Sequence, residues 1–407
     1  MDRSIDKYWL LIESYVYMES SKDKVFLYNT LDASYVETES KEVIRVVERL
    51  LAQSSKYCIL IDNNDLSKIR DFVDEIRLKY IGDIICVSHS AVKPIQVYPI
   101  LNLQNRNKVL DISTINLLEN LHEINLYING SCSKSCDFCS NAFKKFLSCF
   151  KSKDNEMSLK LIERIFNMIE SSSVYKINVL GGDIFEYTEF SQLLELSLSL
   201  KERIVFNFNI LNLPEDESVF TKSDYNWNVI IDFNNDINKI EYLLIRVLGL
   251  KLNMHFMFIV RSKIQYAYVQ QIIEEYCTID YEIKPYYDFD NIDFFKEYVF
   301  LNKEDIFNKP ISIQEIFRNQ VINSNFFGKI GVLCNGDAYS DFCNASFGNL
   351  NNDNIIDCIE NEFLNKYSWF RTRNQGKCRF CFYRYLCPPI SNYEIVIGRD
   401  NLCNVYD

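Results

Sequence analysis

The sequence predicts an α/β protein whose central part is a parallel sheet with helices between its strands. From residue 124 onward, segments of strand character alternate with segments whose apolar residues recur at helical spacing. A loop with three cysteines directly follows the first of these strands, and further cysteines gather in the last third of the chain. With 48% hydrophobic residues among 407, the chain can bury the cores of about two or three domains.

Six segments have strand character: 124–129, 176–180, 204–211, 228–233, 252–260 and 281–287. Helices are predicted between most of them, at 159–169, 190–200, 240–248 and 269–277. Strands that alternate with helices favour parallel pairing, and such folds carry their chemistry in loops at the carboxyl ends of the strands. We therefore expect the functional residues in the loops that follow these strands.

Charge and composition narrow the class of partner. The chain has 44 basic and 56 acidic residues, a net charge of −12, which disfavours binding to nucleic acid and favours a peptide or small molecule. No signal peptide is evident, and no apolar run reaches the roughly 18 residues of a membrane span. We expect a cytoplasmic protein with no membrane partner, in which the 14 cysteines are metal ligands or buried thiols instead of disulfides.

The loop after the first strand contains Cys132, Cys136 and Cys139 in a CxxxCxxC pattern. Three thiolates this close in sequence can hold one soft metal centre, and a triplet leaves one iron of a four-iron cube without a protein ligand. Two alternatives remain. The cysteines could be buried as small apolar side chains, or they could bind zinc with His122, ten residues upstream, as a fourth ligand.

The CxxxCxxC spacing, with Phe138 just before the last cysteine, resembles the signature of the radical SAM superfamily. The resemblance implies a partial (β/α)6 barrel and a 4Fe-4S cluster whose fourth iron is chelated by S-adenosylmethionine. It also implies that Phe138 packs near the adenine of that cofactor.

The second strand ends in Gly181-Gly182-Asp183, where the family carries a Gly-Gly-Glu motif that holds the amino group of S-adenosylmethionine. Two glycines allow the backbone to come close to a ligand. We carry the role over to Asp183, which is shorter than glutamate and has the same charge. The alternative is a tight turn with a solvated aspartate.

Two later strand ends supply further candidates for cofactor binding. Asp232 lies where relatives often have a Ser-x-Asp-Gly sequence, and Arg261 ends the strand 252–260. Each is a candidate for contact with the ribose or the carboxylate of the cofactor, and each could equally be a solvated charge at the rim.

Near the end of the chain, Cys378, Cys381, Cys387 and Cys403 can form a closed site of four sulfur ligands. Such a site fits zinc or an iron-sulfur cluster, and spacing alone does not decide between them. The pattern resembles the SPASM extension of radical SAM peptide maturases, and the resemblance implies an auxiliary 4Fe-4S cluster.

That extension commonly holds two auxiliary clusters, and the sequence predicts that one of them is lost. Asn335-Gly336 predicts a hairpin turn, which places Cys334 beside the turn and Cys343 on the order of 20 Å away. No cysteine stands near 326–328, opposite Cys343, and Ser391 occupies the place of another expected ligand. Cysteines without ligand spacing are predicted to pack in cores: Cys58, Cys86, Cys149, Cys277 and Cys358.

The N-terminal part is predicted to be a small α+β, winged-helix-like unit with strands 8–17 and 25–28 and helices 41–52 and 66–80. It resembles the RiPP recognition element, which binds a leader peptide as an added strand. A dimerisation module or a DNA-binding winged helix is the alternative. The predicted domains are 1–95 (leader binding), 96–123 (linker), 124–300 (radical SAM barrel) and 301–407 (SPASM-like).

Taken with these resemblances, the sequence predicts a radical SAM enzyme that modifies a ribosomally made precursor peptide. Its expected partners are the leader-bearing precursor and an electron donor such as flavodoxin or ferredoxin. The alternative is a noncatalytic protein that binds a leader peptide, with a degenerate radical SAM scaffold and a structural zinc site in its tail.

Overall fold

The structure is a computed structural model. It describes residues 7–52, 57–94, 116–134, 136, 139, 141–152, 156–220, 225–234, 236–250, 252, 254–276, 279–365 and 367–405. Phe138, Cys277 and most of the predicted linker lie outside these ranges. Within them the chain forms one nine-stranded sheet and two three-stranded sheets. None of the helices in the described part is both long and apolar enough to cross a bilayer.

Six parallel strands in chain order form most of the large sheet, as the sequence predicts. They are β7 (Glu123–Tyr127), β8 (Lys176–Leu180), β9 (Ile204–Asn209), β10 (Asn226–Asp232), β11 (Met254–Val260) and β12 (Asp280–Pro285). The helices between them are α5 (Leu159–Ile169), α6 (Phe190–Leu196), α7 (Ile237–Gly249) and α8 (Lys263–Glu275). Side-chain caps begin three of these helices, at Ser158, Asp236 and Ser262.

The last third of the chain extends this sheet. Strand β13 (Lys329–Val332) pairs parallel to β7, and β14 (Asp337–Tyr339) and β15 (Gly348–Asn349) follow antiparallel. The hairpin between β13 and β14 turns at Asn335-Gly336, which confirms that prediction. The helices here are α9 (Ile292–Tyr298), α10 (Lys303–Phe307), α11 (Ile313–Val321), α12 (Ile355–Asn365) and α13 (Asn392–Ile397).

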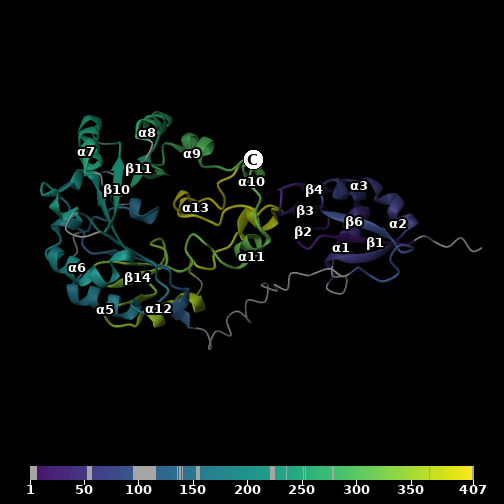
Figure 1. The fold of residues 1–407 in the computed structure, drawn as a ribbon, viewed down its shortest axis with the longest axis horizontal. Coiled ribbons are helices and arrows are strands. Elements are labelled where there is room, and N and C mark those ends of the chain that lie inside the picture. Colours follow the sequence, from purple (N-terminus) through teal and green to yellow (C-terminus); the bar gives the residue numbers. More distant parts are fainter. Residues whose placement is uncertain are drawn as a thin grey trace, which may run out of the picture.

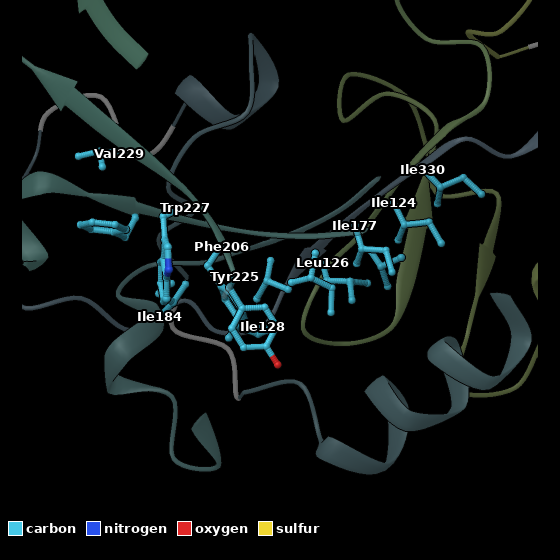
Figure 2. Packing of buried hydrophobic residues seen from close by; sticks show 14 of the residues in the cluster. Ile124, Leu126, Ile128, Ile177, Ile184, Phe206, Tyr225, Trp227, Val229 and Ile330 are labelled. Atoms are coloured by element: carbon cyan, nitrogen blue, oxygen red, sulfur yellow. The ribbon is translucent and has the colours of Figure 1, made fainter. Parts of the chain in front are cut away.

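The two faces of the parallel sheet differ in chemistry because successive residues of a strand point to opposite sides. On one face, apolar residues such as Ile124, Leu126 and Ile177 form the largest core (Figure 2). This core includes the buried side of α5. On the other face, neighbouring strands carry asparagines that pair across the sheet. Asn178 Nδ2 donates to Asn125 Oδ1 at 2.7 Å, and Asn228 Nδ2 donates to Asn207 Oδ1 at 2.7 Å.

The N-terminal unit has more and shorter strands and helices than predicted. The prediction of one strand over 8–17 is wrong, because a turn at Glu13–Tyr15 separates β1 (Lys7–Ile12) from β2 (Val16–Ser20). The expected helix 66–80 is likewise two helices, α2 (Asn63–Lys68) and α3 (Arg70–Leu78), while β3 (Val25–Asn29) and α1 (Lys41–Leu51) agree with prediction. Three strands were not predicted: β4 (Tyr35–Thr38), β5 (Cys58–Asp62) and β6 (Gly82–Cys86).

The sheet β2-β3-β4 packs against the C-terminal part of the chain, and Figure 1 shows α10 and α11 beside it. The Phe26 ring lies 5.3 Å from the Tyr383 ring, and the backbone N–H of Ile311 donates to Tyr28 Oη at 3.0 Å. The same apolar cluster includes Cys387. The N-terminal sheet is therefore in contact with the cysteine-bearing tail.

Glu37, on β4, forms hydrogen bonds and ion pairs across this contact. Its carboxylate accepts hydrogen bonds from Lys303 Nζ at 2.7 Å and Tyr383 Oη at 2.5 Å, and it forms an ion pair with Lys24. These donors outweigh the effect of burial and lower the pKa of Glu37 from 4.5 to about 2.

Replacing Glu37 is expected to loosen this contact in a pH-dependent way. The folded pKa is lower than the unfolded one, so the stabilisation is present above pH 4.5 and is lost as the pH falls toward 2. Glu37→Gln should lower the free energy of unfolding by about 2 to 3 kcal/mol at pH 7. Chemical denaturation at pH 7, 5 and 3 measures this, with Glu39→Gln, an exposed neighbour, as the control. An equal effect of Glu37→Gln at pH 7 and pH 3 would contradict the assignment.

Candidate functional site

The cysteine loop leaves the carboxyl end of β7 and lies over the ends of β8 and β9. Cys132, Cys136 and Cys139 line one cavity, together with Gly182 from the loop after β8. Lys134 and Lys151 line the same cavity and bring positive charge to it. The structure thus brings the three cysteines of the motif together at the edge of the sheet where the sequence predicts them.

The two loops are joined by backbone hydrogen bonds that leave no room for side chains. The N–H of Gly182 donates to Asn129 O at 3.0 Å, and that of Asp183 donates to Ser131 O at 2.6 Å. A Cβ atom on Gly182 would lie 2.0 Å from Ser131 O, and one on Gly181 would lie 2.2 Å from Asn129 Oδ1. The sequence suggested that these glycines admit a ligand, but their immediate neighbour is the backbone of the cysteine loop.

Asn129, which sequence reasoning missed, connects these loops through its side chain. It is fully buried; its Oδ1 accepts from the Gly182 N–H at 3.1 Å, and its Nδ2 donates to Asp183 O at 2.7 Å. An amide that supplies one donor and one acceptor satisfies two backbone groups at once. Only the position of Asn129, two residues after β7, hinted at this role.

Asp183 is buried beside this junction. Its Oδ1 accepts a hydrogen bond from the Phe185 N–H at 3.1 Å and caps a short 3-10 helix, Ile184–Glu186. Burial raises the pKa of Asp183 to about 6, because the charged form loses solvation. The predicted carboxylate therefore lies in a structured turn next to the cysteine loop, with an oxygen that is not used by this cap.

The two remaining candidates, Asp232 and Arg261, form an ion pair with each other. Arg261 Nη2 lies 2.9 Å from Asp232 Oδ2, and Asp232 is 2% exposed. The guanidinium of Arg261 also stands 4.4 Å from the centre of the Tyr286 ring. The ion pair, with Asp232 buried and Arg261 half-buried, lies at the carboxyl ends of β10 and β11.

Lys145 belongs to the same group and was not singled out in the sequence. It is 4% exposed, it donates to the backbone oxygen of Tyr287, and its Nζ lies 3.8 Å from the centre of the Tyr286 ring. Burial and the nearby charge of Arg261 lower the pKa of Lys145 to about 8. No spacing pattern connects Lys145 with Arg261, so only the fold reveals this pair of cations.

Three more residues that the sequence did not mark line the cavity of the cysteine loop: Cys149, Asn209 and Asn212. Asn212 Nδ2 lies 3.6 Å from Cys132 Sγ. Cys149, which we expected only to pack in a core, is 5% exposed. Asn209 ends β9 and Asn212 ends the short 3-10 helix that follows, so their place after a strand was the only signal available.

The chemistry of these side chains fits a soft metal centre. Burial raises the pKa of Cys149, and a hydrogen bond with Cys136 together with burial raises that of Cys139. A bound cation reverses this effect, because coordination deprotonates thiols. Among the described residues, no three Cys, His, Asp or Glu side chains are already grouped to hold a single metal ion. Taking up a metal centre would therefore require the thiols that line the cavity to come closer together.

The four cysteines of the tail also share one cavity, lined by Cys378, Cys381, Cys387 and Cys403. Arg373 Nη1 lies 3.8 Å from Cys378 Sγ, and Asn401 Nδ2 lies 3.3 Å from Cys403 Sγ. Burial raises the pKa of Cys387 to about 12. A metal centre in this cavity would meet four thiols and donors that can stabilise their negative charge.

Cys334 and Cys343, the cysteines considered for a second auxiliary site, differ in exposure. Cys334 is buried at the hairpin turn, whereas Cys343 is exposed in the turn that follows β14. Ser391 caps helix α13: its Oγ accepts from the Tyr393 N–H at 3.2 Å. The residue that stands in place of the expected cysteine thus has a structural role.

The polar face of the parallel sheet borders a cavity of about 770 Å³. Its wall includes the paired asparagines of β7 to β10, charged residues of β12, and aromatic residues such as Tyr127, Phe143 and Phe342. The segment from Phe143 to Leu147 lines this cavity, while Cys149 and Phe150 line the cavity of the cysteines. One loop therefore borders both cavities.

The sequence matches no family model and no curated protein. Solved structures similar to this chain include SuiB of Streptococcus suis bound to S-adenosylmethionine, with 15% identity, a TM-score of 0.48, and 98% of this chain and 99% of that chain covered. They also include SuiB bound to the precursor peptide SuiA, with 14% identity, a TM-score of 0.46 and coverage of 98% and 99%. SuiB by itself gives 15% identity, a TM-score of 0.47 and coverage of 97% and 99%.

Proposed function

We propose that this protein is a radical SAM enzyme that modifies a ribosomally synthesised precursor peptide. One observation carries the proposal: the three cysteines of the CxxxCxxC motif share a cavity with Gly182, at the carboxyl ends of neighbouring parallel strands. This is the edge at which folds with parallel strands and helices place their reacting groups. The finer fold that we propose is a partial (β/α)6 barrel made by β7 to β12.

In this proposal Cys132, Cys136 and Cys139 hold a 4Fe-4S cluster through their thiolates. When bound, the cluster and S-adenosylmethionine would supply reductive cleavage to a 5′-deoxyadenosyl radical that can remove hydrogen from a peptide carbon. Gly182 keeps the strand ends close enough for both loops to reach the cofactor, and the Asp183 carboxylate would bind the amino group of S-adenosylmethionine.

The cations Lys145 and Arg261, near the carboxyl ends of β10 and β11, suit the carboxylate of the methionine part. A carboxylate placed beside Lys145 and Arg261 would gain charge-assisted hydrogen bonds in a desolvated site. Asp232 keeps Arg261 in place through their 2.9 Å ion pair. Phe138 remains our candidate for packing on the adenine.

The tail cysteines, Cys378, Cys381, Cys387 and Cys403, are proposed to hold one auxiliary 4Fe-4S cluster. With four protein thiols available, direct binding of substrate at that cluster is not needed, and electron transfer or structural support is the expected role. A small electron donor such as flavodoxin or ferredoxin would supply the electrons.

The substrate is proposed to be a precursor peptide whose leader binds the N-terminal unit as an added strand. The polar cavity of about 770 Å³ is large enough for several residues of a peptide. The buried side-chain oxygens Asn178 Oδ1 and Asn228 Oδ1 have no hydrogen-bond partner among the described residues. They could accept hydrogen bonds from peptide N–H groups.

Anaerobic reconstitution of the full chain tests this function. We expect about eight irons per chain, with sulfide to match, and formation of 5′-deoxyadenosine from S-adenosylmethionine when reductant is added. Replacing Cys132, Cys136 and Cys139 together by alanine should remove about half of the iron and all of the cleavage. Cys86→Ala, in the N-terminal unit, is the matched control and should change neither.

Absence of 5′-deoxyadenosine formation would favour the noncatalytic alternative over the proposed enzyme. If the wild-type chain gives no more 5′-deoxyadenosine than the triple variant, the proposed enzyme activity is wrong. A noncatalytic peptide-binding protein would then account for the scaffold. Zinc in place of iron in the tail would overturn only the auxiliary cluster.

A further inference from the structure

Cys149 stands ten residues after the cysteine motif, yet it lines the same cavity as Cys132, Cys136 and Cys139. Four thiols therefore face a site for which the motif supplies three.

The backbone that follows Cys149 in the chain is hydrogen-bonded to both loops of the site. The Phe150 N–H donates to Gly181 O at 2.9 Å, and the Ser152 N–H donates to Gly130 O at 3.2 Å. Gly181 precedes Gly182 in the loop after β8, and Gly130 stands two residues before Cys132. The thiol of Cys149 is thus held at the place where the cysteine loop and the glycine loop meet.

A second side chain points to a ligand in this cavity. Asn209 is 3% exposed and lines the cavity, and its Nδ2 has no hydrogen-bond partner among the described residues. A buried donor without an acceptor is costly, so an acceptor is expected beside it. Asn212 Nδ2 already lies 3.6 Å from Cys132 Sγ, which shows the kind of contact that a thiolate or sulfide would offer to Asn209.

We propose that Cys149 is a fourth thiol ligand of the metal centre at the cysteine loop, bound to the iron that the triplet leaves open whenever S-adenosylmethionine is absent. This inference rests on the proposed function. When Cys149 binds, its Sγ releases a proton to solvent and forms one Fe–S bond. When the cofactor arrives, that bond would break, the ammonium group of the cofactor would give a proton to Sγ, and the resulting amino nitrogen and the carboxylate would take the place of Sγ. No electron is transferred in either direction.

Such a ligand has two measurable consequences. It protects the open iron from loss until the cofactor is present. It also competes with the cofactor, so that removing it should increase the affinity for S-adenosylmethionine, about 5- to 10-fold. A residue with a merely structural role would have the opposite effect, because a damaged cavity binds its cofactor more weakly.

The test uses the full chain, reconstituted anaerobically, as wild type, Cys149→Ala and Cys149→Ser. Cys58→Ala serves as the control, since Cys58 is also buried but lies on β5 of the N-terminal unit. Each protein is oxidised with limiting ferricyanide, without and with S-adenosylmethionine, and its iron content and three-iron EPR signal are measured. The dissociation constant of S-adenosylmethionine is measured by equilibrium binding.

We expect both Cys149 variants to lose about one iron per chain without the cofactor and to gain the three-iron signal, while wild type and Cys58→Ala keep their iron. Both variants should also bind S-adenosylmethionine more tightly. Iron loss at the wild-type rate, or equal or weaker binding of the cofactor, would overturn the role of Cys149. If Cys132→Ala leaves the iron content of the chain unchanged, the proposed function itself fails, which is a different result.

Discussion

Gly182→Ala is expected to abolish the proposed metal site at the cysteine loop while the fold of the chain persists. The new Cβ would lie 2.0 Å from Ser131 O, a backbone atom that cannot move without shifting the loop that carries Cys132. Displacing reacting groups by about 1 Å can lower a rate about 100-fold. We therefore expect 5′-deoxyadenosine formation to fall by at least about 100-fold, together with loss of the iron bound by the motif.

Gly249→Ala is the matched control for this experiment. Gly249 ends helix α7, and a Cβ there would meet no atom within 4 Å. Alanine is favoured over glycine in a helix, so this variant should keep its iron and its activity. If Gly182→Ala also kept both, the close junction of the two loops would not be required by the site.

Arg373→Met is expected to destabilise the tail and remove its proposed metal centre. Arg373 is 7% exposed and pairs with Glu394 at 2.7 Å, with Pro388 O at 2.6 Å and with Cys378 Sγ at 3.8 Å. Its removal leaves the buried carboxylate of Glu394 without its cation, which costs about 3 to 5 kcal/mol. Chemical denaturation should show this loss, and iron analysis should show about four irons fewer per chain.

Two further variants distinguish the effect of losing the Arg373–Glu394 ion pair from the effect of losing side-chain packing. Arg373→Met with Glu394→Gln should recover part of the stability, because the double variant no longer buries an unpaired charge. Arg379→Met, at an exposed position in the same segment, should behave like wild type. A free energy of unfolding for Arg373→Met within about 1 kcal/mol of wild type would contradict the role of the pair.

The order of the parallel strands and the place of the cysteine loop could be predicted because both depend on local sequence. Apolar periodicity within β7 to β12 and the helices between them is visible in single segments, and right-handed crossovers leave few topologies. The hairpin at Asn335-Gly336 was predictable for the same reason, since the turn needs a glycine with positive φ, here 86° at Gly336.

Pairing between strands far apart in sequence was not predicted. The hairpin turn at Asn335-Gly336 indicates β13, but no local signal indicates its parallel pairing with β7, about 200 residues away in sequence. In the N-terminal unit, β5 and β6 flank β1 through antiparallel pairing that no turn motif announces. The tertiary context decides such short strands, because their stability comes from neighbours on the sheet.

By itself, the sequence determined that three thiols gather after a strand, because Cys132, Cys136 and Cys139 lie within one short loop and must stay close in any fold. Only the tertiary structure decided what surrounds them. Cys149 and Asn209 reach the same cavity through contacts between segments far apart in the chain, such as the hydrogen bond from Phe150 N–H to Gly181 O. The spacing of residues in the sequence does not indicate such contacts, because they depend on how the ends of the strands pack side by side in the fold.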